Sequence, residues 1–107
     1  MLLLVCLAAS LWIPTASAEK VQDLKPTGYV NDFAGVLSPQ TRSNLETLCT
    51  EVDQQAHAQI AVVTINTTGD DPIDDFAVRL EEKWKVGPKA TDKGVILLLA
   101  TDDHHYR

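Results

Sequence analysis

Cysteine, glycine and aromatic residues are scarce in this chain of 107 residues, which has two cysteines, five glycines and two each of Phe, Trp and Tyr. Cys6 lies in an N-terminal stretch that we expect to be removed, and Cys49 would then be alone. A single cysteine forms no internal disulfide, which excludes a small secreted protein held together by disulfide bonds. Cys49 falls on an apolar helical stripe, so we expect it to pack in the core rather than act as a nucleophile.

Charged residues are absent from residues 1–18. The stretch is apolar over residues 2–13, is interrupted by Pro14, and ends in Ala16-Ser17-Ala18, which is typical of a signal-peptide cleavage site. We therefore predict cleavage after Ala18 and export to the periplasm, the cell envelope or the cell exterior. An uncleaved membrane anchor is the alternative, but the apolar stretch is shorter than the ~20 residues that span a bilayer, so we expect no transmembrane span.

Basic residues are outnumbered, with 9 Lys and Arg against 15 Asp and Glu and a net charge of −6. Proteins that bind nucleic acid neutralise phosphates with basic side chains, so the charge argues against such a partner. It argues equally against binding to an anionic membrane surface. The sequence also lacks a nucleophile elbow, a phosphate-binding glycine loop, a His-Glu-x-x-His motif and a Cys-x-x-Cys motif. No common catalytic motif therefore assigns a reaction.

The apolar pattern predicts two helices. Residues 39–56 carry apolar side chains at helical spacing after Ser38 and Pro39, which suit the cap and the first helical position. The second helix would have Asp71 as its N-cap and end at Gly87-Pro88. Its apolar face predicts a core position for Trp84. That face comprises Ile73, Phe76, Ala77, Leu80 and Trp84.

Two continuous apolar runs, residues 59–66 and 95–100, predict strands buried on both faces of a parallel sheet. With the helix between them they form a βαβ unit, which is expected to be right-handed. Residues 105–107 then begin an antiparallel partner. The prediction is an α/β fold with a βαβ core and a mixed sheet flanked by helices.

The expected organisation is a signal peptide over residues 1–18, a flexible lead-in over 19–28 and an α/β domain over 29–107. The predicted strands leave the edges of the sheet unpaired, and no cap or polar tail closes the sequence. We therefore expect an N-terminal piece of a longer protein, with the domain truncated at its C-terminal side.

Acidic residues fall at two edges of the predicted sheet. One set follows the strands and comprises Asp70, Asp71, Asp102, Asp103, His104 and His105. At the other edge Asp92 precedes the second strand, and Asp32 lies in a loop that could approach it. Oxygen ligands of this kind suit hard cations such as calcium or magnesium, whereas helix capping and turn formation are the alternative roles. The residues alone do not rank the two sets.

Four stretches between Tyr29 and Arg107 resemble, in order, the TPM domain family, named for thylakoid-lumen, photosystem-repair and membrane-associated members. Some of its members are acid phosphatases. The stretches are residues 29–37 (YVNDFAGVL), 58–64 (AQIAVVT), 84–87 (WKVG) and 92–98 (DKGVILL). The family usually has Asp-Asn-Gly where this chain has Asp92-Lys93-Gly94.

The resemblance implies an acidic site formed by Asp32 and Asp92. These two residues would bind a divalent cation, calcium or magnesium, or one of them would be a general acid. Lys93 would contact the phosphate of a phosphomonoester substrate. The implied activity is hydrolysis of that ester. The alternative is a non-catalytic interaction or assembly module that binds a membrane protein.

We expect residues 19–107 produced alone to unfold with a midpoint below about 60 °C, because two full strands and part of a third bury little apolar surface. Differential scanning calorimetry measures this midpoint directly. A cooperative transition above about 60 °C would contradict the view that the domain is truncated.

Overall fold

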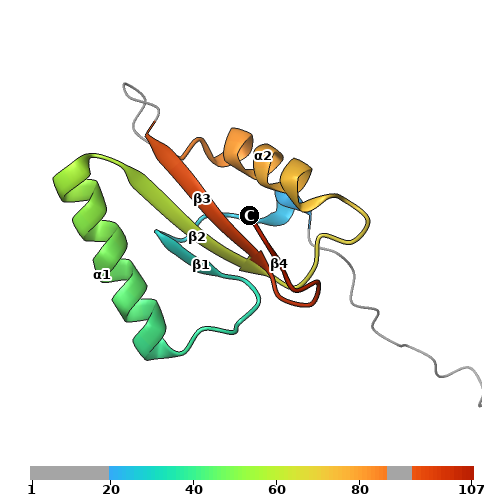
Figure 1. Ribbon diagram of the computed structural model, residues 1–107, viewed down its shortest axis with the longest axis horizontal. Coiled ribbons are helices and arrows are strands. Elements are labelled where there is room, and N and C mark those ends of the chain that lie inside the picture. The colour runs from blue at the N-terminus through green and yellow to red at the C-terminus, as the bar shows by residue number, and fades with distance from the viewer. Residues whose placement is uncertain (1–19, 87–92) are drawn as a thin grey trace, which may run out of the picture.

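The computed structural model describes residues 20–86 and 93–107 as a mixed four-stranded sheet with two helices (Figure 1). The predicted signal peptide with its cleavage site at Ala18, the helix end at Gly87-Pro88, and Asp92 lie outside these residues. The strand order is β1-β2-β3-β4, in which β1, β2 and β3 are parallel and β4 is antiparallel to β3. The predicted α/β class is therefore confirmed. The strands are β1 (Val30–Asp32), β2 (Gln59–Ile65), β3 (Gly94–Ala100) and β4 (His105–Tyr106).

Each helix covers one face of the sheet. Helix α2 (Ile73–Trp84) buries Phe76 and Leu80 against alternate residues of β2, namely Val63 and Ile65. Helix α1 (Pro39–Ala56) covers the opposite face, where the intervening residue Val62 is buried. The strands follow one another in chain order while the helices lie on opposite faces, so the two crossovers have opposite hands. One of them is of the rare left-handed kind.

The helix ends follow local chemistry, with one correction. The predicted cap of α1 is confirmed, because the Ser38 hydroxyl accepts a hydrogen bond from the Thr41 N–H at 3.1 Å. The predicted cap of α2 is wrong. Pro72 takes the N-cap position without a side-chain hydrogen bond, while the Asp71 carboxylate pairs with Arg79 at 2.6 Å. We expected the Asp71 carboxylate to accept a hydrogen bond from the first turn of α2. It pairs with Arg79 instead.

Strand β1 was not predicted, because three residues are too few to show a period. Its position depends on Asn31, whose side chain is buried and makes five hydrogen bonds. The amide accepts from the Thr27 N–H at 2.6 Å and donates to the Val62 carbonyl of β2 at 3.3 Å. Asn31 thereby ties the turn before β1 to the central strand.

The lead-in differs from the flexible stretch that the sequence predicted. Residues Val21–Asp23 form a short 3₁₀ helix, η2, and Leu24 is buried in the core. Side chains of α2 hold this segment. The Lys83 ammonium donates to the Val21 and Gln22 carbonyls at 3.1 and 2.6 Å, and the Trp84 indole donates to the Leu24 carbonyl at 3.1 Å. These bonds and the burial of Leu24 hold residues 21–24 against α2.

Within residues 20–86 and 93–107, no helix combines the length and the apolar character that crossing a membrane requires.

Replacing Leu24 by Ala tests the docking of the lead-in. Truncating a buried leucine costs about 2–5 kcal/mol, so urea unfolding should show a loss of that size. Lys25→Ala is the matched control, because its exposed side chain should change the free energy of unfolding by less than about 0.5 kcal/mol. Equal stability of the two variants would mean that the lead-in contributes nothing to the core.

Candidate functional site

Asp32, predicted as a metal ligand, lies at the end of β1 with a side chain that is 1% exposed. Its carboxylate accepts four hydrogen bonds. Oδ1 accepts from the Thr64 hydroxyl at 2.6 Å and the Val36 N–H at 3.0 Å. Oδ2 accepts from the Leu37 N–H at 3.0 Å and the Arg42 guanidinium at 3.3 Å. Both oxygens are therefore engaged in holding the loop between β1 and α1.

This environment changes the acidity of Asp32. Burial by itself raises its pKa, but the hydrogen bonds from Thr64, Leu37, Val36 and Arg42 outweigh burial and lower the pKa to about 2. A group with that pKa is ionised at mildly acidic pH and holds no proton to donate. In this arrangement Asp32 is suited to organise a loop and poorly suited to act as a general acid.

We expected Asp32 to approach the residues that precede β3. The structure does not bring it there. Asp32 is paired in register with Thr64, whereas Gly94 is paired with Gln59. Lys93 lies beside Gln59, whose N–H donates to the Lys93 carbonyl at 2.9 Å. Gln59 and Thr64 are five residues apart on β2, about 17 Å at the rise of a strand. Asp32 and Lys93 therefore lie at opposite ends of the sheet.

The acidic set at the carboxyl ends of the strands also has structural roles. The Asp103 carboxylate accepts from the Thr67 hydroxyl at 2.8 Å and the Thr68 N–H at 3.1 Å, which lowers its pKa. These bonds join the turn before β4 to the loop after β2. In the described part of the chain, no three His, Cys, Asp or Glu side chains converge as a metal site.

Cys49 matches its predicted role. It is buried on α1, and burial, with a smaller contribution from the Glu46 carboxylate, raises the pKa of its thiol. Because the thiolate is the reactive form, a raised pKa suits a packing residue rather than a nucleophile.

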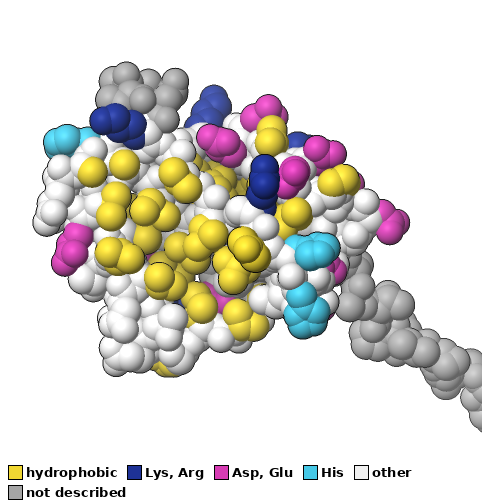
Figure 2. All heavy atoms as spheres, in the orientation of Figure 1, with side chains coloured by type: hydrophobic (Ala, Val, Ile, Leu, Met, Phe, Trp, Pro, Cys, Tyr) yellow, Lys and Arg dark blue, Asp and Glu magenta, His cyan; other side chains and the backbone are white. Residues whose placement is uncertain are grey.

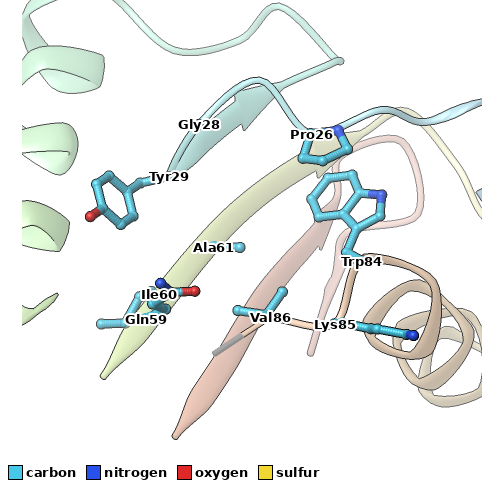
Figure 3. Close-up of a pocket in the computed structure, with 9 residues that line it drawn as sticks. All are labelled: Pro26, Gly28, Tyr29, Gln59, Ile60, Ala61, Trp84, Lys85 and Val86. Carbon is cyan, nitrogen blue, oxygen red and sulfur yellow. The ribbon is translucent and has the colours of Figure 1, made fainter. Parts of the chain in front are cut away.

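A cleft of about 320 Å³ opens at the amino end of the sheet. Figure 3 shows its arrangement: Trp84 and Pro26 form one side, Tyr29 and Gln59 lie on the other, and Ala61 lies on β2 between them. Trp84 packs partly into the core, as predicted, and also forms this wall. The lining residues are Pro26, Gly28, Tyr29, Gln59, Ile60, Ala61, Trp84, Lys85 and Val86.

Sequence reasoning missed this cleft because its walls come from the lead-in, the start of β2 and the end of α2. No local motif links these three segments. Among the described residues predicted for the site, Lys93 lies at this edge, adjacent to Gln59 in the ladder. The Tyr29 hydroxyl is already committed, because it donates to the Asp53 carboxylate at 2.5 Å. The cleft thus has a largely apolar wall, and the backbone of Lys93 lies at its edge, hydrogen-bonded to Gln59.

Comparison with known proteins identifies a family and similar solved structures. The family described as the TPM domain matches residues 30–107, which confirms the resemblance. The solution NMR structure of the N-terminal domain of a protein from P. gingivalis superposes with a TM-score of 0.76 at 28% sequence identity. The match covers 85% of this chain and 62% of that chain, so this chain spans less than two thirds of its solved neighbour. No curated protein matches the sequence.

Asp32→Asn tests the loop-organising role. The amide nitrogen would face the donors from Leu37 and Arg42, so we expect a loss of about 2 kcal/mol in the free energy of unfolding at pH 7. Because the folded-state pKa is depressed, this stabilisation is present above the ordinary value of 3.8 and is lost as the pH falls toward about 2. Urea unfolding at pH 7, 4 and 2.5 measures both effects.

Wild-type protein should lose most of this contribution between pH 4 and 2.5, and the Asp32→Asn variant should lack that part of the acid dependence. Asp70→Asn, at an exposed turn residue, is the control. If the Asp32→Asn variant and wild type lose stability equally on acidification, the carboxylate does not hold the loop.

Proposed function

The chain belongs to the TPM domain family, and from that premise we propose that it is an exported domain that binds a phosphomonoester at the amino edge of its sheet. The observation that carries the proposal is the cleft beside Lys93. Pockets that bind small molecules are mostly apolar with a few polar groups that fix orientation. Trp84, Pro26 and Ala61 would contact the organic part of the ester.

Lys93 supplies the charge that the phosphate requires. Lys93 is exposed and immediately precedes β3. Its backbone carbonyl accepts a hydrogen bond from the N–H of Gln59, which lines the cleft. A lysine ammonium is a flexible point charge and can reach a phosphate without a fixed geometry. Lys85 also lines the cleft, but its side chain points away from Ala61 (Figure 3). We therefore assign the main phosphate contact to Lys93.

Hydrolysis of the bound ester, assisted by calcium or magnesium, is the activity proposed for this site. A divalent cation would neutralise phosphate charge and polarise the phosphoryl group. Asp32 does not fit as its ligand, because four donors occupy the carboxylate and the residue lies at the far end of the sheet. Asp92, adjacent to Lys93 in the sequence, is the remaining candidate ligand from the predicted pair.

A non-catalytic interaction module at a membrane is the second candidate. The exposed apolar side chains of Val95 and Leu97 on β3 favour it, because contiguous apolar surface commonly marks a docking site. In that case the amino-edge cleft would have no ligand, and a membrane protein would be the partner. The two candidates differ in whether a phosphomonoester binds.

The test uses the full-length protein with p-nitrophenyl phosphate at mildly acidic pH, with and without calcium. Lys93→Ala should weaken binding about tenfold, the effect of losing one ion pair near a protein surface. Asp92→Asn should remove the effect of calcium, whereas Asp32→Asn should retain it at a temperature where the variant is folded. Binding measured by calorimetry and turnover by absorbance separate the two steps.

Arg79→Ala is the control for net charge, because Arg79 pairs with Asp71 away from the cleft. Equal affinity of the Lys93→Ala and Arg79→Ala variants would contradict the site. Binding without turnover would support a ligand-binding domain and exclude the hydrolase. No binding by any form would favour the interaction module.

A further inference from the structure

Trp84 and Pro26 together form one wall of the amino-edge cleft (Figure 3). The six-membered ring of the Trp84 indole is turned toward Ala61, and the indole nitrogen is turned away from it (Figure 3). That nitrogen donates to the Leu24 carbonyl at 3.1 Å, and Leu24 is not part of the lining. The polar atom of Trp84 is thus satisfied outside the cleft, and the part of the side chain that borders the cleft is apolar and aromatic.

The indole is held in position before any ligand arrives. Besides the bond to Leu24, it has an edge-to-face contact with the Phe33 ring, with centroids 6.3 Å apart and planes at 63°. Trp84 is also the last residue of α2 and packs against the core cluster. Because the wall is already ordered, a ligand that packs against it does not have to immobilise this side chain, which lowers the entropic cost of binding.

The size and the charge of the cleft select a small anion. Its volume of about 320 Å³ lies at the lower end of the range of roughly 300–1,000 Å³ that small-molecule sites span. The chain carries a net charge of −6, yet the described residues that line the cleft include Lys85 and no acidic residue. The Asp53 carboxylate, next to the lining, accepts the hydroxyl hydrogen of Tyr29. An ester with one small organic group matches this lining.

We propose that the organic group of the phosphomonoester is a single aromatic ring, which packs against Trp84 and Pro26. This inference rests on the proposed phosphomonoester site and names the class of ester that the site takes. An aromatic ring interacts favourably with an indole in offset-stacked or edge-to-face geometry, a gain that a saturated ring does not share. Ala61, on β2 between the two sides of the cleft, has a small side chain and leaves room for the ring.

Exposed apolar residues on β3 are the competing place for an aromatic ring. Helix α1 packs against β1 and β2, and Val95 and Leu97 of β3 are 57% and 42% exposed. Figure 2 shows hydrophobic side chains gathered over the middle of the sheet. This corrects the prediction that β3 is buried on both faces, since only its alternate residues Leu98 and Ala100 belong to the core with α2. The experiment must therefore distinguish Trp84 from β3.

Calorimetric titration of the full-length protein with phenyl phosphate and cyclohexyl phosphate tests the proposal, because these esters match in charge and differ in the ring. We expect phenyl phosphate to bind about threefold to tenfold more tightly, the gain of an aromatic pair beyond area burial. Apolar burial alone would favour the larger surface of the saturated ring. Trp84→Leu should abolish the preference for phenyl phosphate, and Trp84→Phe should retain it. Lys93→Ala should weaken both esters equally, and Leu97→Ser is the control for β3.

Equal affinities for the two esters in the wild type would overturn the aromatic class and leave the phosphomonoester site standing. This comparison needs no variant, so it decides the matter even if Trp84→Leu does not fold. A preference that is lost in Leu97→Ser and kept in Trp84→Leu would place the ring on β3 and overturn the proposal as well. If neither ester binds but phenol binds more tightly than cyclohexanol, the phosphate site is contradicted and the aromatic wall is supported, so the two proposals fail separately.

Discussion

Burial of β2 on both faces is the constraint on which the rest of this structure depends. Val63 and Ile65 pack against α2, Val62 lies under α1, and β1 and β3 satisfy the backbone groups on its two edges. A strand that is apolar on both faces requires a cover on each side. The opposite hands of the two crossovers follow from this requirement, because consecutive neighbouring strands must place one helix on each face.

Acidic residues that look like metal ligands in the sequence satisfy backbone donors in the structure. Asp32 holds the loop after β1, and Asp103 joins the turn before β4 to the loop after β2. Loops at the ends of parallel strands expose N–H groups that need acceptors, and a carboxylate supplies several lone pairs at once. The open cleft lies at the other end of the sheet, which is why the proposed chemistry moves to Lys93.

Long segments with a clear apolar pattern were predicted well. Short elements, and features built from several separate segments, were not. Helix α1 and strands β2 and β3 agree with their patterns to within a residue or two, since each buries a repeating set of side chains. β1, with three residues, has no detectable period and depends on Asn31. Leu48 follows the helical period, yet its side chain is 53% exposed. For the proposed site, the resemblance suggested Lys93, but no sequence pattern could join Pro26, Gln59 and Trp84 into one cleft.

The sequence by itself determined the two helices, the two long strands, the mixed α/β class and the family, because these depend on local apolar patterns and on the order of short motifs along the chain. The tertiary structure alone decided which end of the sheet each acidic residue occupies. It also decided which donors surround Asp32 and which half of a sheet face stays open. These depend on strand register and on the width that one helix covers, and both arise from contacts between segments far apart in the chain.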